Sequence, residues 1–311
     1  METVEPDHLP PECFWLQPGR FPCPDWEGIA NQVEIREDLV FLNETWNRVA
    51  SYWLGLFAHA LGAGYRLHSS KNFIIVTQAE PSRVKEVLDF LEYCHAEILR
   101  SLPFINASEL CGKCAVIVFA DEQEFYEYLS VFCSDDRDQG LAGGVFLNQG
   151  YGHFILPSEN LDRYRAVMCH ELCHSLLSGF DLPLWLNEAI TGEVEHLIVG
   201  GNPYFFDREM VREHQAYWTP DLIQSFWTGE SFSFPDEGQQ LSYHLARFIF
   251  NALASYSTPE TMAGFVNSVV HEDAGFSAAS EHFGVHPGEI LTDFLGEGDW
   301  NCPDIPENGG A

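Results

Sequence analysis

The stretch "CHELCHSLLSGFDLPLWLNEAITGEVE" (Cys169–Glu195) carries the strongest chemical signal in this sequence of 311 residues. It opens with the pattern H-E-x-x-H, and apolar residues around that pattern recur at the spacing of a helix. Residues four apart on a helix lie about 40° apart around its axis, so His170 and His174 point the same way, one turn apart. Two imidazoles placed like this can bind one zinc ion. Glu171 lies beside them, where a carboxylate can take a proton from water.

A third ligand has to support this interpretation, because H-E-x-x-H also occurs by chance in many unrelated proteins. A metzincin would need glycine at position 177 and histidine at position 180. The chain has Leu177 and Phe180 there, which excludes that class. The next expected helix, "LPLWLNEAITGEVE", offers Glu188, Glu193 and Glu195 as carboxylate ligands.

The combination of "HELCH" with "WLNEA" resembles the gluzincin metallopeptidases, most of all the peptidase-MA-like group and more distantly the zinc aminopeptidases. The resemblance covers roughly residues 70–297 and implies, through the W-L-N-E segment, that Glu188 is the third zinc ligand. In the aminopeptidases, 18 residues separate the H-E-x-x-H motif from this ligand. That spacing would select Glu193 instead. We favour Glu188, because loop lengths vary between families while the helix start that aims the carboxylate should not. The two glutamates lie about 140° apart on a helix, so they cannot both face the metal.

The resemblance also implies an activity. Members of the group hydrolyse peptide bonds with a Zn²⁺ cofactor, and the second residue of the motif, here Glu171, acts as general base on zinc-bound water. Tyr243 matches a catalytic tyrosine on a later helix and would stabilise the tetrahedral oxyanion. His244 is the alternative donor, and a core tyrosine is the alternative interpretation of Tyr243. The implied substrate is a peptide or a protein.

Within that activity, the sequence favours an endopeptidase. Zinc aminopeptidases carry a G-x-M-E-N segment whose glutamate binds the free amine of the substrate, and the equivalent stretch "GGVFLNQG" contains no acid. The alternative from another class is a catalytically silent binding or regulatory protein with the metallopeptidase fold. The presence of Glu171 favours the enzyme, because a structural metal site needs ligands but no general base. A third possibility is a protease that its own N-terminal arm occludes.

The order of the expected elements indicates an α+β fold, with a mixed sheet and helices first and helices alone afterwards. Apolar runs predict strands at 72–78 and 114–120 and a hairpin at 144–156. Residues 1–36, which are rich in proline and acids, predict an irregular arm. Apolar spacing predicts helices at 37–62, 80–103, 121–132, 159–178, 184–199, 206–216, 238–256, 259–270, 275–283 and 286–295.

The resemblance implies that this fold is a thermolysin/gluzincin-like catalytic domain, with an N-terminal helical extension before it. We therefore expect an irregular arm and a helix at residues 1–66 and a metallopeptidase domain at 67–300. Within this domain, residues 67–180 would form the sheet-bearing half and residues 181–300 the helical half. Residues 301–311 are expected to form a loose tail.

The composition argues against several classes of function. With 47 acidic and 15 basic residues, the formal net charge is -32, which argues against binding to nucleic acid or to anionic membrane surfaces. A cationic substrate is compatible with this charge, although a solvated acidic surface is the simpler interpretation. The most apolar window, Ser51–Tyr65, is shorter than the ~20 residues that span a bilayer. The acidic start does not resemble a signal peptide, and the odd number of cysteines, nine, indicates reduced thiols, so we expect a cytoplasmic protein.

Several other cysteine and histidine side chains need an interpretation. Cys111 and Cys114 have C-x-x-C spacing but no second pair at zinc-finger distance, so we interpret both as thiols at the edge of the core. Cys169 and Cys173, one turn apart on the metal-binding helix, should face into the core as small apolar residues. His153 lies on the expected hairpin, where it could reach the cleft.

Overall fold

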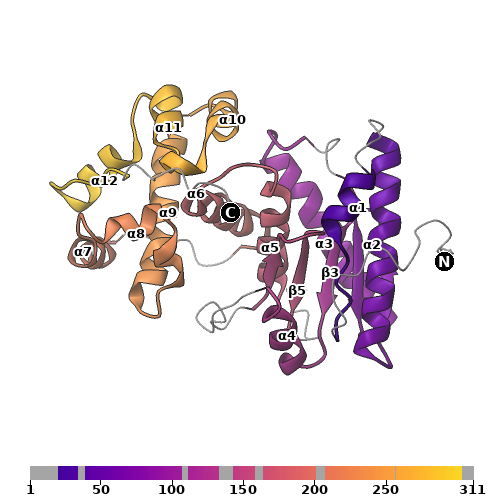
Figure 1. The fold of residues 1–311 in the computed structure, drawn as a ribbon. Helices are drawn as coiled ribbons and strands as arrows, with labels where there is room; N and C mark the ends of the chain where they lie inside the picture. Colours follow the sequence, from indigo (N-terminus) through magenta and orange to yellow (C-terminus); the bar gives the residue numbers. More distant parts are fainter. Residues whose placement is uncertain are drawn as a thin grey trace. The chain divides into compact units, whose positions relative to one another are not determined.

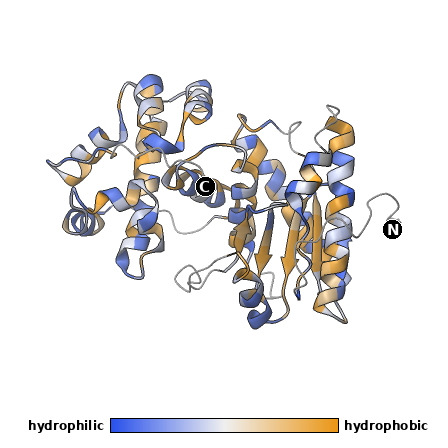
Figure 2. Ribbon diagram, viewed as in Figure 1, coloured by the Kyte–Doolittle hydropathy of each residue, from blue (hydrophilic) through white to orange (hydrophobic). Residues whose placement is uncertain are grey.

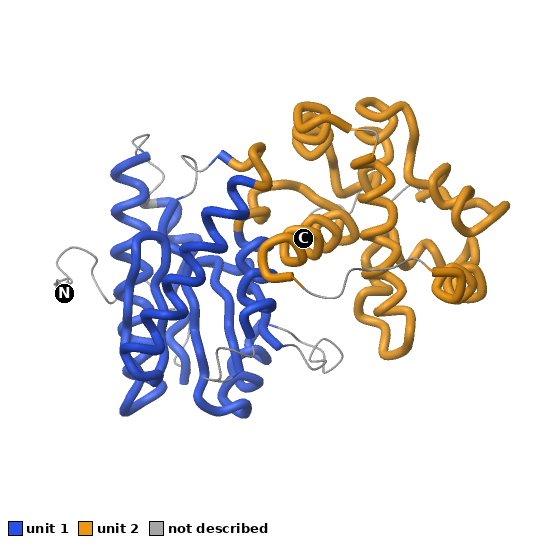
Figure 3. Tube along the Cα trace, turned by 180° about the vertical axis from the view of Figure 1, so that it is seen from behind, with its two compact units in different colours: residues 1–100, 106–175 blue, residues 101–105, 176–311 orange. Residues whose placement is uncertain are grey.

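The chain divides into two compact units. The first contains residues 1–100 and 106–175, and the second contains residues 101–105 and 176–311 (Figure 3). The domain limits expected from the sequence, after residues 66 and 180, stay a prediction. The computed structural model describes residues 20–33, 39–106, 111–132, 143–157, 164–200, 207–255 and 257–302.

A five-stranded mixed sheet forms the centre of the first unit, with the strand order β1-β2-β3-β5-β4. The three inner strands run parallel, and the two edge strands, β1 and β4, run antiparallel to their neighbours. The described residues after the sheet form helices, so the predicted α+β class is confirmed. The strands are β1 (Arg66–Ser69), β2 (Phe73–Thr77), β3 (Cys114–Val118), β4 (Val145–Leu147) and β5 (His153–Leu156).

The sequences of the strands explain their places in the sheet. Every residue of β2 and β5 is buried, as expected for parallel strands that are covered on both faces. Figure 2 shows the inner strands as predominantly hydrophobic. By contrast, β1 ("RLHS") is mostly exposed and has no apolar alternation. This explains why the sequence analysis did not predict it.

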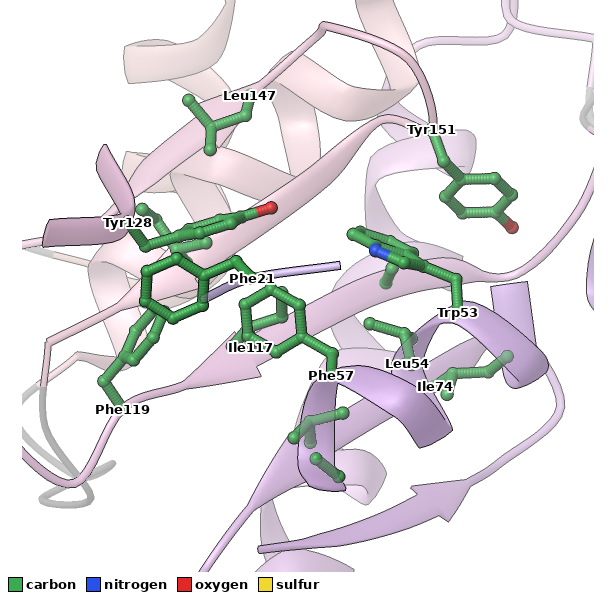
Figure 4. Packing of buried hydrophobic residues seen from close by; sticks show 14 of the residues in the cluster. Phe21, Trp53, Leu54, Phe57, Ile74, Ile117, Phe119, Tyr128, Leu147 and Tyr151 are labelled. Carbon is green, nitrogen blue, oxygen red and sulfur yellow. The ribbon is translucent and has the colours of Figure 1, made fainter. Parts of the chain in front are cut away.

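Helices cover both faces of this sheet. On one face, α2 (Leu39–Leu61) directs Trp53 and Phe57 toward a core that includes Ile117 of β3 (Figure 4). The short helix α4 (Glu122–Leu129) contributes to the same core. On the opposite side of the sheet lie α3 (Pro81–Ser101) and α5 (Arg165–Leu177) (Figure 1). This second layer places α5, with its H-E-x-x-H motif, directly against the sheet.

The prediction of an irregular arm over residues 1–36 is wrong for its final part. Residues Trp26–Val33 form the helix α1, which begins after Asp25. The Asp25 side chain accepts a hydrogen bond from the backbone N–H three residues further on, at 2.9 Å, which is the N-cap contact that starts a helix. Phe21 stacks on Phe57 with ring centroids 5.4 Å apart, so this segment belongs to the core of the first unit. Residues 1–19 lie outside the described residues, and an occluding arm stays a prediction.

The second unit consists of helices in the part that the structure describes. The helix α6 packs against α9, and an aromatic cluster of buried tryptophans and phenylalanines lies near the start of α6. The helices are α6 (Leu184–Val199), α7 (Arg208–Tyr217), α8 (Ile223–Trp227), α9 (Glu237–Ser255), α10 (Pro259–Ser268), α11 (Phe276–Phe283) and α12 (Pro287–Leu295), with 3-10 turns η2 (Glu230–Ser233) and η3 (His271–Asp273).

Most of the predicted elements are confirmed, with ends that agree to within three residues. The helix predicted at 159–178 is confirmed as α5, although residues 158–163 lie outside the described residues. Three elements of eight residues or fewer, α1, α8 and β1, had no pattern in the sequence from which they were predicted. Among the described helices, none has the length and apolar character needed to cross a membrane.

Candidate metal centre

Two histidines of α5 bring their ring nitrogens together. The imidazole rings of His170 and His174 lie 4.7 Å apart between centroids and are tilted by 78°, and their Nε2 atoms are 3.0 Å apart. Neighbouring residues of the helix are completely buried, so packing fixes the orientation of α5. These buried residues are Met168, Cys169, Leu172 and Cys173.

Glu188 completes a group of three possible ligands. It lies in the first half of α6 and, like the two histidines, is half-buried. One ligand atom from each of His170, His174 and Glu188 lies within 4.8 Å of the other two. The structure thus brings together the three residues that the sequence analysis selected, and this group could hold a metal ion.

The chemistry and spacing of these donors fit a zinc ion. Two imidazole nitrogens and one carboxylate oxygen form a common ligand set of catalytic zinc sites. Two ligand atoms bound ~2.0–2.1 Å from a tetrahedral ion lie about 3.3 Å apart, which is close to the 3.0 Å between the imidazole nitrogens. Among the residues that the structure describes, the group contains three ligands and no fourth. Such a set leaves a coordination position open, as catalytic sites do and closed structural sites do not.

Glu193, the alternative third ligand, has other partners. Its Oε1 accepts hydrogen bonds from Arg247 Nε and from Asn251 Nδ2, each at 2.8 Å. Both donors lie on α9, and the Arg247 side chain is almost completely buried. The carboxylate of Glu193 therefore ties α6 to α9, while Glu188 belongs to the metal group.

The residues predicted to act in catalysis lie on the same elements as expected, and their roles stay predictions. Glu171 is buried beside His170 on α5. Tyr243 lies on α9, and its ring packs edge-on against Phe232 with centroids 5.2 Å apart. The neighbouring His244 is buried, and both this burial and the positive charge of Arg247 lower the pKa of its imidazole.

The suggestion that His153 reaches the cleft is wrong. Its side chain is buried in the core of the first unit. Nδ1 lies 2.7 Å from the carbonyl oxygen of Tyr151, and Nε2 lies 2.8 Å from the hydroxyl of Tyr128. A carbonyl only accepts, so Nδ1 carries the proton and Nε2 accepts from the hydroxyl. Burial lowers the pKa of this imidazole to about 4, so His153 is a neutral structural residue.

The two pairs of cysteines differ in burial. Cys169 and Cys173 are completely buried, as the sequence analysis predicted. Cys111 is exposed, and Cys114 is half-buried, with its Sγ 3.8 Å from Ser175 Oγ. Removal from water raises the pKa of the Cys114 thiol to about 11. A reactive thiol needs a lowered pKa, so this value argues against a reactive thiol at Cys114.

Comparison with known proteins adds no family to this description: no family model matches the chain, and no curated protein is significantly similar to it. The geometry of the site and the motifs that supply its residues are therefore the features that point to a function. Two supporting residues were not anticipated from the sequence, namely Trp185 and Arg247. The tryptophan of "WLNEA" was visible as a signal, but its hydrogen-bond partner is remote in the sequence.

Proposed function

We propose that this protein is a zinc-dependent peptidase of the gluzincin type, with a thermolysin-like catalytic domain. The convergence of His170, His174 and Glu188 is the observation that carries this proposal. The first two come from H-E-x-x-H and the third from W-L-N-E, two motifs that resemble the same group of enzymes. A chance cluster of histidine and glutamate side chains would not be expected to combine residues from both motifs.

The chain's own residues supply the remaining chemistry. A zinc ion held by these three side chains would polarise a peptide carbonyl and lower the pKa of water toward ~7. Glu171 accepts the proton of the attacking water and returns it to the leaving amine. The burial of its carboxylate keeps competing water away from this transfer and strengthens its electrostatic interactions. Tyr243 donates a hydrogen bond to the oxyanion that forms from the carbonyl oxygen, with His244 as the alternative donor.

The sheet edge suits a peptide substrate. The strand β4 pairs with β5 along one side only, in the part of the chain that the structure describes. Its other side presents backbone groups to which an extended peptide can add as a further strand. The segment that contains β4, "GGVFLNQG", has no acid to bind a free amino terminus. The absence of this acid supports an endopeptidase over an aminopeptidase.

The variant Glu171→Gln tests the proposal. Glutamine has nearly the same size but cannot accept the proton, so we expect the variant to keep its zinc and to lose cleavage of a quenched fluorescent peptide mixture by about 10²-fold or more. Glu86→Gln, on the exposed side of α3, is the control and should cleave like the wild type.

Unchanged cleavage by Glu171→Gln would contradict the mechanism. A wild-type protein that binds zinc tightly but cleaves nothing in the mixture would favour a catalytically silent metal-binding protein with the same fold.

A further inference from the structure

The first turn of α6 is fixed by a contact that is remote in the sequence. Trp185 is completely buried, and its indole Nε1–H donates to the carbonyl oxygen of Ala274, at 3.0 Å. Ala274 is also completely buried and lies 89 positions further along the chain. Both residues belong to the second unit.

The acceptor carbonyl is held in an unusual turn. Ala274 has φ 51° and ψ 24°, a left-handed conformation that is unfavourable for a residue with a Cβ atom. Such a conformation persists only where the surroundings enforce it. The backbone N–H of Ala274 donates to the carbonyl of His271 at 3.1 Å, and the Asp273 side chain accepts from Gly275 N at 2.8 Å and from Ser277 N at 2.9 Å. The turn therefore presents the Ala274 carbonyl in a fixed direction.

The same turn is tied to the segment that enters α6. The side chain of Asp181 accepts a hydrogen bond from the backbone N–H of His271 at 3.2 Å. Meanwhile α6 lacks a side-chain N-cap, because its N-cap residue is Pro183. The local contacts of its first turn that the structure shows are backbone hydrogen bonds, from Leu186 N and Asn187 N to the Pro183 carbonyl, and no side chain caps it. The contacts of Asp181 and Trp185 with the turn around Ala274 fix the position of this first turn.

We propose that Trp185 is a positioning residue for the metal group, and that its hydrogen bond to Ala274 sets the direction in which α6 presents Glu188. Glu188 follows Trp185 by three residues, which is less than one helical turn. A small rotation of the first turn therefore moves the carboxylate away from the imidazoles. This inference rests on the proposed metal site and assigns a function to a residue that does not touch the metal.

The protein contains a matched control for this role. Trp227 is as deeply buried as Trp185, and its Nε1–H also donates to a backbone carbonyl, that of Trp300, at 3.1 Å. The two indoles pack edge-on in the same aromatic cluster with centroids 6.1 Å apart. Trp227 lies on α8, which carries none of the three ligands. Trp185→Phe and Trp227→Phe therefore remove the same chemical group from similar surroundings.

The experiment compares zinc affinity in the two variants by competition with a chelator, beside thermal unfolding of the metal-free proteins. We expect both variants to lose a similar amount of stability. Only Trp185→Phe should bind zinc more weakly, by about 10- to 100-fold, as found for residues that orient metal ligands. With Co²⁺ in place of zinc, the visible absorption spectrum should change in Trp185→Phe alone.

Equal zinc affinity in the two variants would overturn the inference. If Trp185→Phe does not fold, the variant Asp181→Ala is used instead. Asp181 is exposed and its side chain bonds the same turn. Its replacement should therefore weaken zinc binding by a smaller factor without unfolding the protein. Unchanged affinity there would also overturn it. A wild-type protein that binds no zinc would instead refute the proposed function, and the inference with it.

Discussion

The helices α5 and α6 both supply ligands to the metal group, but they are held in place by different means. On α5, the spacing of the helix alone puts His170 and His174 on one side, and continuous apolar burial fixes the helix against its unit. On α6, the position of Glu188 depends on contacts before and after it. Trp185 bonds a carbonyl 89 residues away, and Glu193 pairs with Arg247, 54 residues away.

This difference shows which ligands are positioned by local helical structure and which by tertiary contacts. The relative position of the two histidines depends only on the helical conformation of α5. A substitution elsewhere that keeps α5 helical should therefore keep the two imidazoles side by side. The glutamate needs the second unit to be folded, because the residues that orient α6 come from α9 and from the turn before α11. The metal group should therefore be sensitive to mutations in the second unit that lie far from it in the sequence.

The largest effect is expected on α5. His174→Ala removes one of three ligands, and two ligands do not retain zinc against a chelator, so the variant should lose its metal entirely. Cys173→Ala is the neighbouring control: its side chain is completely buried and lies outside the metal group, so zinc should remain bound. Zinc analysis after dialysis measures both. Loss of zinc from Cys173→Ala, in a folded protein, would show that the thiol contributes to the site.

The ion pair on α6 should affect stability. Arg247→Met leaves the Glu193 carboxylate mostly buried without its cation, which should cost roughly 3 kcal/mol of unfolding free energy. Adding Glu193→Gln should restore part of this loss, because the uncompensated charge is gone. The exposed pair Arg83–Glu86 in the first unit is the comparison, and Arg83→Met should cost less than about 1 kcal/mol. Urea unfolding measures all three variants, and equal losses for Arg247→Met and Arg83→Met would contradict the account.

A further effect depends on pH and appears in both units. Burial lowers the pKa of His153 to about 4, and burial together with the charge of His244 lowers the pKa of His214 to about 4. In His214, Nδ1 accepts a hydrogen bond from Trp218 Nε1 at 3.1 Å. Both imidazoles are neutral in the folded protein and become protonated more readily after unfolding, when the pKa is ~6.5. Stability should therefore fall as the pH drops from about 6.5 to about 4, by up to roughly 3 kcal/mol for each histidine.

Urea unfolding between pH 7.5 and pH 4.5 tests this expectation. His153→Gln lowers stability at neutral pH but removes one titrating group, so its stability should depend less steeply on pH than that of the wild type. The same slope in both proteins would show that His153 does not contribute.

The sequence was sufficient for the parts of the fold that follow from local patterns. Residues 184–199 were predicted as a helix with the observed ends, and the buried strands β2 and β5 were visible as apolar runs. The pair His170 and His174 followed from helical spacing alone. Glu188 was selected by resemblance, and the structure brings it to the histidines.

The parts that could not be predicted depend on tertiary contacts. The edge strand β1 is polar and owes its conformation to pairing with β2. His153 looked available on its hairpin, but α2 and α4 cover it, and Tyr128 satisfies its second nitrogen. The bond from Trp185 to Ala274 joins two segments whose proximity no local pattern reveals. In each case the deciding partner lies far away in the sequence.

The most direct test of the account is the zinc content of three purified proteins: the wild type, Glu188→Ala and Glu193→Ala, each dialysed with zinc and then analysed for metal. We expect one zinc per chain in the wild type and in Glu193→Ala, and none in a folded Glu188→Ala. Zinc retained by Glu188→Ala and lost by Glu193→Ala would assign the third ligand to the other glutamate. A wild-type protein without zinc would contradict the metal centre itself.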